Sequence, residues 1–211
     1  WDTPTSDWVQ LQGDIIGDQQ GQGLGRSVSL AYANGFYHLA VGEPGWNYDR
    51  KGRARVFYAN STTGWTMRPN SDAGSEIRGV STNDFCGTCV SLDPTASTVA
   101  VSSTGASNRR GEVVVYVGTS ISDSWTPMER DLVGGTVFIG PEKDKMTVTA
   151  AREHVSNNGF VLAIGWPFAH TSPYDSTLSS AGRVDGYAWS TSSAERNPLQ
   201  DGEWKQISQQ Y

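Results

Sequence analysis

The feature that most constrains the fold is an internal repeat of short apolar runs separated by turn residues. Three segments share the order apolar run, short polar turn, apolar run, and they span residues 25–42, 87–102 and 146–165. A third run that begins with glycine follows each segment, at residues 52–58, 111–117 and 182–189. Each unit then closes on a tryptophan that opens a short fourth run, at Trp65, Trp125 and Trp204. Trp8 opens an equivalent run before the first unit. Such a pattern indicates one supersecondary unit repeated along the chain.

The runs have the character of β-strands. Val28 and Leu30 alternate with serine, which is the period of two expected for a strand with unlike faces. Residues 113–117 are apolar throughout, as in a strand covered on both sides. Asn34-Gly35 lies between two runs and is a strong hairpin signal. We therefore predict an all-β protein with few helices.

Four strands per repeat is the strand number of a β-propeller blade. The prediction is about three four-stranded antiparallel blades plus a leading outer strand at Trp8, in a single region over residues 1–211. The repeats span approximately residues 8–64, 65–124 and 125–203, with a terminal strand at 204–211. Three blades do not close a ring, so we expect a part of a larger propeller or of an assembly. Trp1 in place of Met likewise suggests a processed product or an excerpt of a longer chain.

The repeat resembles the FG-GAP unit of integrin-like β-propellers, in the form found in secreted or surface proteins of algae and other microbial eukaryotes. The matching residues in the first unit are Trp8, Gly13-Asp14-Ile15-Ile16-Gly17, Leu24-Gly25-Arg26-Ser27-Val28-Ser29-Leu30, Ala40-Val41-Gly42-Glu43-Pro44 and residues 52–58. The second unit keeps Phe85-Cys86-Gly87 and Val90-Ser91-Leu92, whereas the third lacks the Phe-Gly pair. The resemblance implies a propeller and an extracellular or cell-surface location, and it names no activity.

The same family often carries calcium loops built from alternating Asp and Asn residues. The corresponding loops here are Asn47-Tyr48-Asp49-Arg50-Lys51-Gly52 and Ser107-Asn108-Arg109-Arg110-Gly111, which place cations where carboxylates are needed. We therefore expect no metal and no cofactor.

Composition and charge exclude two classes of partner. The net charge of −6 disfavours a nucleic-acid surface, because such a surface needs a cationic patch. No apolar stretch approaches the roughly 18 residues of a membrane-spanning helix, so we expect no membrane insertion.

Cys86 and Cys89 form the one Cys-x-x-Cys pair of the chain, at the start of a predicted strand. A zinc site needs a second ligand pair, and His38, His154 and His170 are scattered singly. Two readings stay open, a local disulfide and two small buried thiols.

We find no catalytic constellation in the sequence. No Gly-x-Ser-x-Gly elbow is present, and no Ser, His and Asp can be assigned as a triad. The acids Glu43, Asp49, Glu112 and Asp175 are interpreted as solvated loop residues. We therefore predict a protein that is not an enzyme.

Aromatic residues unique to one repeat are the ligand-binding candidates, because variable loops on a fixed scaffold carry recognition. These residues are Trp46, Tyr48, Trp166, Phe168 and Tyr174. The repeated tryptophans are instead interpreted as packing residues. Asn60 starts the sequon Asn60-Ser61-Thr62 and is a candidate glycosylation site.

The function expected from these features is a non-catalytic extracellular structural or adhesion module. We expect its partners to be other proteins or glycans at the cell surface. One form of this function is self-assembly, with the chain as a subunit of a surface filament or coat. The alternatives are a carbohydrate-binding propeller lectin and a secreted enzyme whose site lies outside this stretch.

Overall fold

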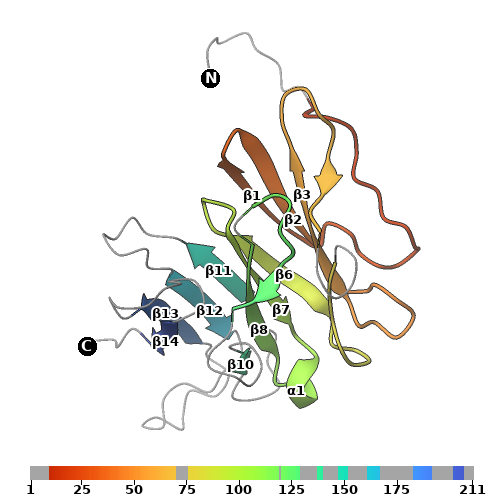
Figure 1. The fold of residues 1–211 in the computed structure, drawn as a ribbon. Helices are drawn as coiled ribbons and strands as arrows, with labels where there is room; N and C mark the ends of the chain where they lie inside the picture. Colours follow the sequence, from red (N-terminus) through yellow and green to blue (C-terminus); the bar gives the residue numbers. More distant parts are fainter. Residues whose placement is uncertain are drawn as a thin grey trace, which may run out of the picture.

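The chain folds into antiparallel β-sheets (Figure 1). The computed structural model describes residues 10–69, 76–118, 120–128, 137–139, 147–151, 161–166, 183–191 and 202–206. Within these ranges the only helix is α1 (Ala106–Arg109), which has left-handed residues inside it and is closer to a turn. None of the described helical residues forms a segment long and apolar enough to cross a membrane. The prediction of a largely β fold is confirmed.

The first sheet contains five strands. They are β1 (Ser27–Ala33), β2 (Phe36–Glu43), β3 (Arg53–Ala59), β4 (Thr66–Met67) and β5 (Ile77–Arg78). The order is β1-β2-β3-β4, and β5 pairs with β3 beside β4. The predicted hairpin joins β1 to β2, where Asn34 and Gly35 have φ values of 52° and 81°.

The second and third sheets repeat this order. The second contains β6 (Cys86–Leu92), β7 (Thr98–Ser103), β8 (Glu112–Val117), β9 (Thr126–Pro127) and β10 (Val137–Ile139). The third contains β11 (Thr147–Ala151), β12 (Val161–Trp166), β13 (Arg183–Thr191) and β14 (Gly202–Gln206). Each repeat of the sequence therefore supplies the core strands of one sheet.

Strand registers show which residues are equivalent in the three sheets. Val28 pairs with Val41 in the first sheet, and Val90 pairs with Val101 in the second. In the third sheet, the corresponding pair is Val148 with Ile164.

The outer strands agree with this equivalence. Phe57 pairs with Met67, Tyr116 with Pro127, and Tyr187 with Gln206. The second residue of each pair comes two positions after a tryptophan, namely Trp65, Trp125 or Trp204. The three tryptophans therefore occupy one repeated position.

The prediction of four strands per sheet was wrong for the first two sheets. β5 and β10 add a fifth strand along the first half of β3 and β8. Both strands lead into the glycine of a short repeated motif, Ile77-Arg78-Gly79 and Phe138-Ile139-Gly140. The matching stretch Ile15-Ile16-Gly17 is not a strand in the structure. Trp8, the predicted start of a leading outer strand, lies outside the described residues.

The three sheets pack face to face, one after another (Figure 1). β1 and β2 of the first sheet contact β6 of the second, and β6 and β7 contact β11 of the third. We call the face of a sheet that looks toward the preceding repeat its N-side face, and the opposite face its C-side face. Each contact thus joins the C-side face of one sheet to the N-side face of the next.

Two apolar cores fill these contacts. Between the first and second sheets the core includes Ala31, Ala40, Ala54, Val56, Val90, Leu92, Val99, Val101 and Trp125. Between the second and third sheets it includes Ala100, Val113, Val115, Met128, Leu162, Ile164 and Trp189. Burial of these side chains supplies the main force that holds the sheets together.

Glycines allow the first two sheets to approach at one end of the contact. A Cβ atom added to Gly42 on β2 would lie 1.9 Å from the carbonyl oxygen of Gly87 on β6. Gly87 itself has a φ of 85°, at the irregular start of β6. The Ser27 Oγ atom donates to the same Gly87 oxygen at 2.9 Å. The two backbones therefore pack directly on each other here.

A buried arginine closes the other end of the contact. The Arg68 backbone N–H donates to the carbonyl oxygen of Val56, and the Met128 N–H donates to that of Val115. Arg68 and Met128 therefore occupy equivalent positions in the first and second sheets. The Arg68 guanidinium lies 4.1 Å from the centre of the Trp125 ring. It also donates to the carbonyl oxygens of Ala96 and Gly118 at 2.9 Å each, and to that of Ser120. Burial lowers its pKa to about 10.

We predict that Arg68→Ala destabilises the fold by about 2–4 kcal/mol, because it leaves a cavity and removes the donors of buried carbonyl groups. Arg68→Met, which introduces the residue found at the equivalent position of the second sheet, should keep the packing and lose less. Urea unfolding of both variants measures the difference. Equal stability of the alanine variant and the wild type would contradict this role.

Candidate functional site

A polar cavity of about 760 Å³ opens between loops of the first two sheets. Three loops form it: the β2–β3 loop, the segment between β5 and β6, and the β7–β8 loop with α1. The cavity thus lies where the first and second sheets meet, and we call it the loop cavity. Its lining residues are Arg50, Ser81, Thr82, Asn83, Asp84, Phe85, Thr104, Gly105, Ser107, Asn108 and Arg109.

The backbone around the loop cavity is held in an uncommon conformation. The lining residues with positive φ that are not glycine are Arg50, Asn83, Phe85, Ser107, Asn108 and Arg109. Such residues cost free energy and persist where surrounding contacts fix them, which is frequent at binding sites. Here backbone N–H groups of Asn83 and Phe85 donate to the carbonyls of Asp49 and Arg50 at 2.8 and 3.1 Å. The loops are therefore cross-linked before any ligand arrives.

Charges of both signs border the loop cavity. Arg50 and Arg109 are exposed at its edge, whereas Asp84 is buried. The Asp84 carboxylate accepts the N–H groups of Val80 and Ser81 at 2.9 and 2.6 Å, so it holds the loop together. Burial raises the pKa of nearby Glu112. A hydrogen bond from Ser107 lowers this pKa in part, and the negative charge of Asp84 raises it further. The outward positive charge is thus the part available to a ligand.

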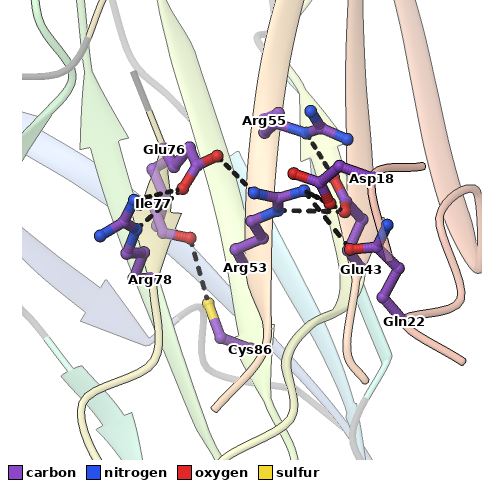
Figure 2. Close-up of polar contacts among 9 residues, drawn as sticks. All are labelled: Asp18, Gln22, Glu43, Arg53, Arg55, Glu76, Ile77, Arg78 and Cys86. Atoms are coloured by element: carbon purple, nitrogen blue, oxygen red, sulfur yellow. Dashed lines mark hydrogen bonds and ion pairs between the residues drawn. The ribbon is translucent and has the colours of Figure 1, made fainter. Parts of the chain in front are cut away.

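A second polar group, the ionic cluster, lies on the first sheet (Figure 2). Arg53 on β3 is its centre, with only 2% of its side chain exposed. Its guanidinium contacts the carboxylates of Glu43 at 2.8 Å, Glu76 at 2.5 Å and Asp18 at 2.8 Å. Arg55 pairs with Glu43.

The ionic cluster joins β2, β3, β5 and the segment before β1. Arg53, Glu43 and Glu76 each contact at least two groups of opposite charge, which compensates the burial of their charges. Asp18 has a lowered pKa: partial burial opposes the shift, but hydrogen bonds from Gln22 and Arg53 and the Arg53 charge outweigh it. We assign the ionic cluster a structural role.

The predicted ligand-binding aromatics are not brought together by the described structure. The guanidinium carbons of Arg53 and Arg78 lie 5.0 and 4.8 Å from the centre of the Trp46 ring, so Trp46 packs on the ionic cluster. Tyr48 is fully exposed in the β2–β3 loop. Trp166 ends β12, and Phe168 and Tyr174 lie outside the described residues. Trp46 and Tyr48 are not among the described residues that line the loop cavity.

Asn60 lies in a turn after β3. Its Oδ1 atom accepts the backbone N–H groups of Thr62 and Thr63 at 2.9 and 2.8 Å, together with both threonine hydroxyls. Ser61 and Thr62 are exposed. Glycosylation at this sequon stays a prediction.

Cys86 and Cys89 are free thiols in the structure. Cys86 belongs to the core between the first and second sheets, whereas Cys89 packs against the core on the other side. The two side chains thus lie on opposite faces of the second sheet. Burial raises the pKa of the Cys86 thiol to about 12.

Sequence reasoning missed the loop cavity, since its residues are ordinary loop residues spread over three connections. The pair Asn83 and Asn108 was the available signal, because asparagine tolerates positive φ. Comparison with family models and with curated protein sequences finds no match for this chain.

We predict that the folded protein contains two free thiols and that Cys86 is unreactive, because the buried thiol cannot form the reactive thiolate near neutral pH. Titration with a thiol reagent should detect at most Cys89 under native conditions and both residues in guanidinium chloride. A count of zero after unfolding without reductant would instead show a disulfide.

Proposed function

We propose that this chain is a three-blade segment of an integrin-like β-propeller and that it acts as a non-catalytic extracellular scaffold for proteins or glycans. Three antiparallel sheets with one strand order and one register support the propeller. The first strands of the sheets also adjoin: β1 contacts β6, and β6 contacts β11. Adjoining first strands are what a radial arrangement around an axis produces.

The loop cavity carries the proposal of a binding function. Loops that vary between repeats meet there on a frame of paired strands, and rigid scaffolds with loop sites are a general plan for recognition. Left-handed residues and cross-loop hydrogen bonds hold the cavity in one shape. A preformed site costs less conformational entropy on binding than one that must order.

The second candidate is a lectin, and the lining of the loop cavity favours it. Hydroxyl and amide groups of Ser81, Thr82 and Asn83 suit the hydroxyl groups of a sugar. Arg50 and Arg109 favour a glycan that carries carboxylate or sulfate groups, because guanidinium binds these anions with paired hydrogen bonds.

The test is binding of the purified chain to a glycan array that includes uronic-acid and sulfated glycans. We expect saturable binding to acidic glycans, and mass spectrometry should recover the ligand unchanged. Arg109→Gln should weaken binding by roughly tenfold or more, since a hydrogen bond to a charged group contributes about 1.5–3 kcal/mol. Arg26→Gln, at an exposed arginine that does not line the cavity, is the matched control.

Two outcomes contradict the proposal. A cleaved or otherwise altered ligand would indicate an enzyme. Equal binding by the Arg109 and Arg26 variants would place the site elsewhere than in the loop cavity.

A further inference from the structure

A pocket of about 230 Å³ lies between β5 of the first sheet and the N-side face of the second sheet. Its walls are largely apolar and include Val101, Val114, Tyr116 and Pro127. The carboxyl group of Glu112 also lines the pocket. Val80, another lining residue, is 84% exposed, so the pocket reaches the surface. The pocket shares no lining residue with the loop cavity.

The first sheet fills the equivalent place with arginine side chains. The strand registers make Arg53 equivalent to Glu112, and Arg55 equivalent to Val114. Both arginines are buried in the ionic cluster of the first sheet. In the second sheet the two shorter side chains leave room for the pocket, and a carboxylate stands where the first sheet has a guanidinium group.

The described residues supply no cation to the Glu112 carboxylate. It accepts a hydrogen bond from the Ser107 hydroxyl at 3.2 Å. Burial nevertheless raises the pKa of Glu112, and the charge of Asp84 adds to the rise. Arg78 also lines the pocket, but its guanidinium pairs with Glu76 at 2.7 Å (Figure 2). Glu112 is therefore a partly buried acid whose charge is not compensated by a described residue.

A guanidinium group on a short carbon stem matches this combination of one carboxylate and apolar walls. The planar guanidinium donates paired hydrogen bonds to a carboxylate, and aromatic rings such as that of a tyrosine attract cations. Methylene groups gain free energy from contact with valine side chains. An apolar cavity of about 150 Å³ can hold benzene, so a pocket of about 230 Å³ can hold a guanidinium with roughly three or four carbons. Calcium is a poor match, because it takes about six to eight oxygen ligands.

We propose that this pocket binds an alkylguanidinium group, with its nitrogens on the Glu112 carboxylate and its carbon stem against Val101 and Val114. The ligand takes, in the second sheet, the place that the chain's own arginines hold in the first. A free guanidine compound and an arginine side chain of a partner protein carry this same group. The site is separate from the loop cavity and goes beyond the proposed scaffold function.

The test is an NMR titration of the isotope-labelled full chain with butylguanidinium. We expect saturable shifts of the backbone amide signals around Glu112 and Val114. Butylurea, a neutral compound of nearly the same shape, should cause no comparable shifts. A capped peptide with a single arginine distinguishes the two sources, because tighter binding of the peptide assigns the site to a partner protein and weaker binding assigns it to a small molecule.

Two variants and a control locate the site. Glu112→Gln keeps the size of the side chain and should weaken binding roughly tenfold or more, because it removes the charge from the hydrogen-bond acceptor. Val114→Arg introduces the arginine of the equivalent first-sheet position and should abolish binding by filling the pocket. Asp14→Asn, at an exposed carboxylate that does not line the pocket, is the matched control.

Three outcomes would overturn the proposal. The first is equal binding of butylguanidinium and butylurea, and the second is equal binding by the Glu112 and Asp14 variants. The third is no binding by the folded chain at roughly 10 mM butylguanidinium, a concentration above the dissociation constants of weak complexes. Binding of acidic glycans in the loop cavity is measured separately, so a failure of this site leaves the proposed function standing.

Discussion

The arrangement of the whole molecule depends on the direct contact between the backbones of neighbouring sheets. Where β2 ends and β6 begins, Gly42 and Gly87 leave no room for a side chain. This contact fixes the distance between the first two sheets, and the alanine and valine side chains beside it fill the space that the distance defines. Because the sheets stand so close, small residues recur on one face and larger branched residues on the other.

Charged residues adapt this plan at particular places. Arg68 holds a position that Met128 fills with an apolar side chain, and it offsets its burial through Trp125 and backbone carbonyls. Arg53 is also buried, on the N-side face of the first sheet, and its charge is compensated by the carboxylates that surround it. Buried charges of this kind add little net stability, since their replacement by well-packed apolar residues is often neutral or stabilising.

Much of the fold could be predicted, because repetition reinforces weak local signals. The Asn34-Gly35 turn and the repeated valines located strands and register. β5 could not be recognised, since Ile77 between Glu76 and Arg78 reads as a polar loop, and those charges are neutralised by Arg53 and by each other. The loop cavity was equally hidden, because the positions of Asn83 and Arg109 depend on the packing of two sheets. Trp46 was proposed as a ligand contact, but its ring lies beside two arginines of the same sheet.

The most direct measurement of the backbone contact is the unfolding free energy of Gly42→Ala beside that of Gly64→Ala. At Gly64 a Cβ atom meets nothing within 4 Å, so the second substitution is the control. Close packing of the sheets predicts that Gly42→Ala lowers the unfolding free energy by about 1–3 kcal/mol or more, because the added methyl group overpacks the contact. Gly64→Ala should change it very little. Equal stability of the two variants would contradict the contact on which the arrangement of the sheets depends.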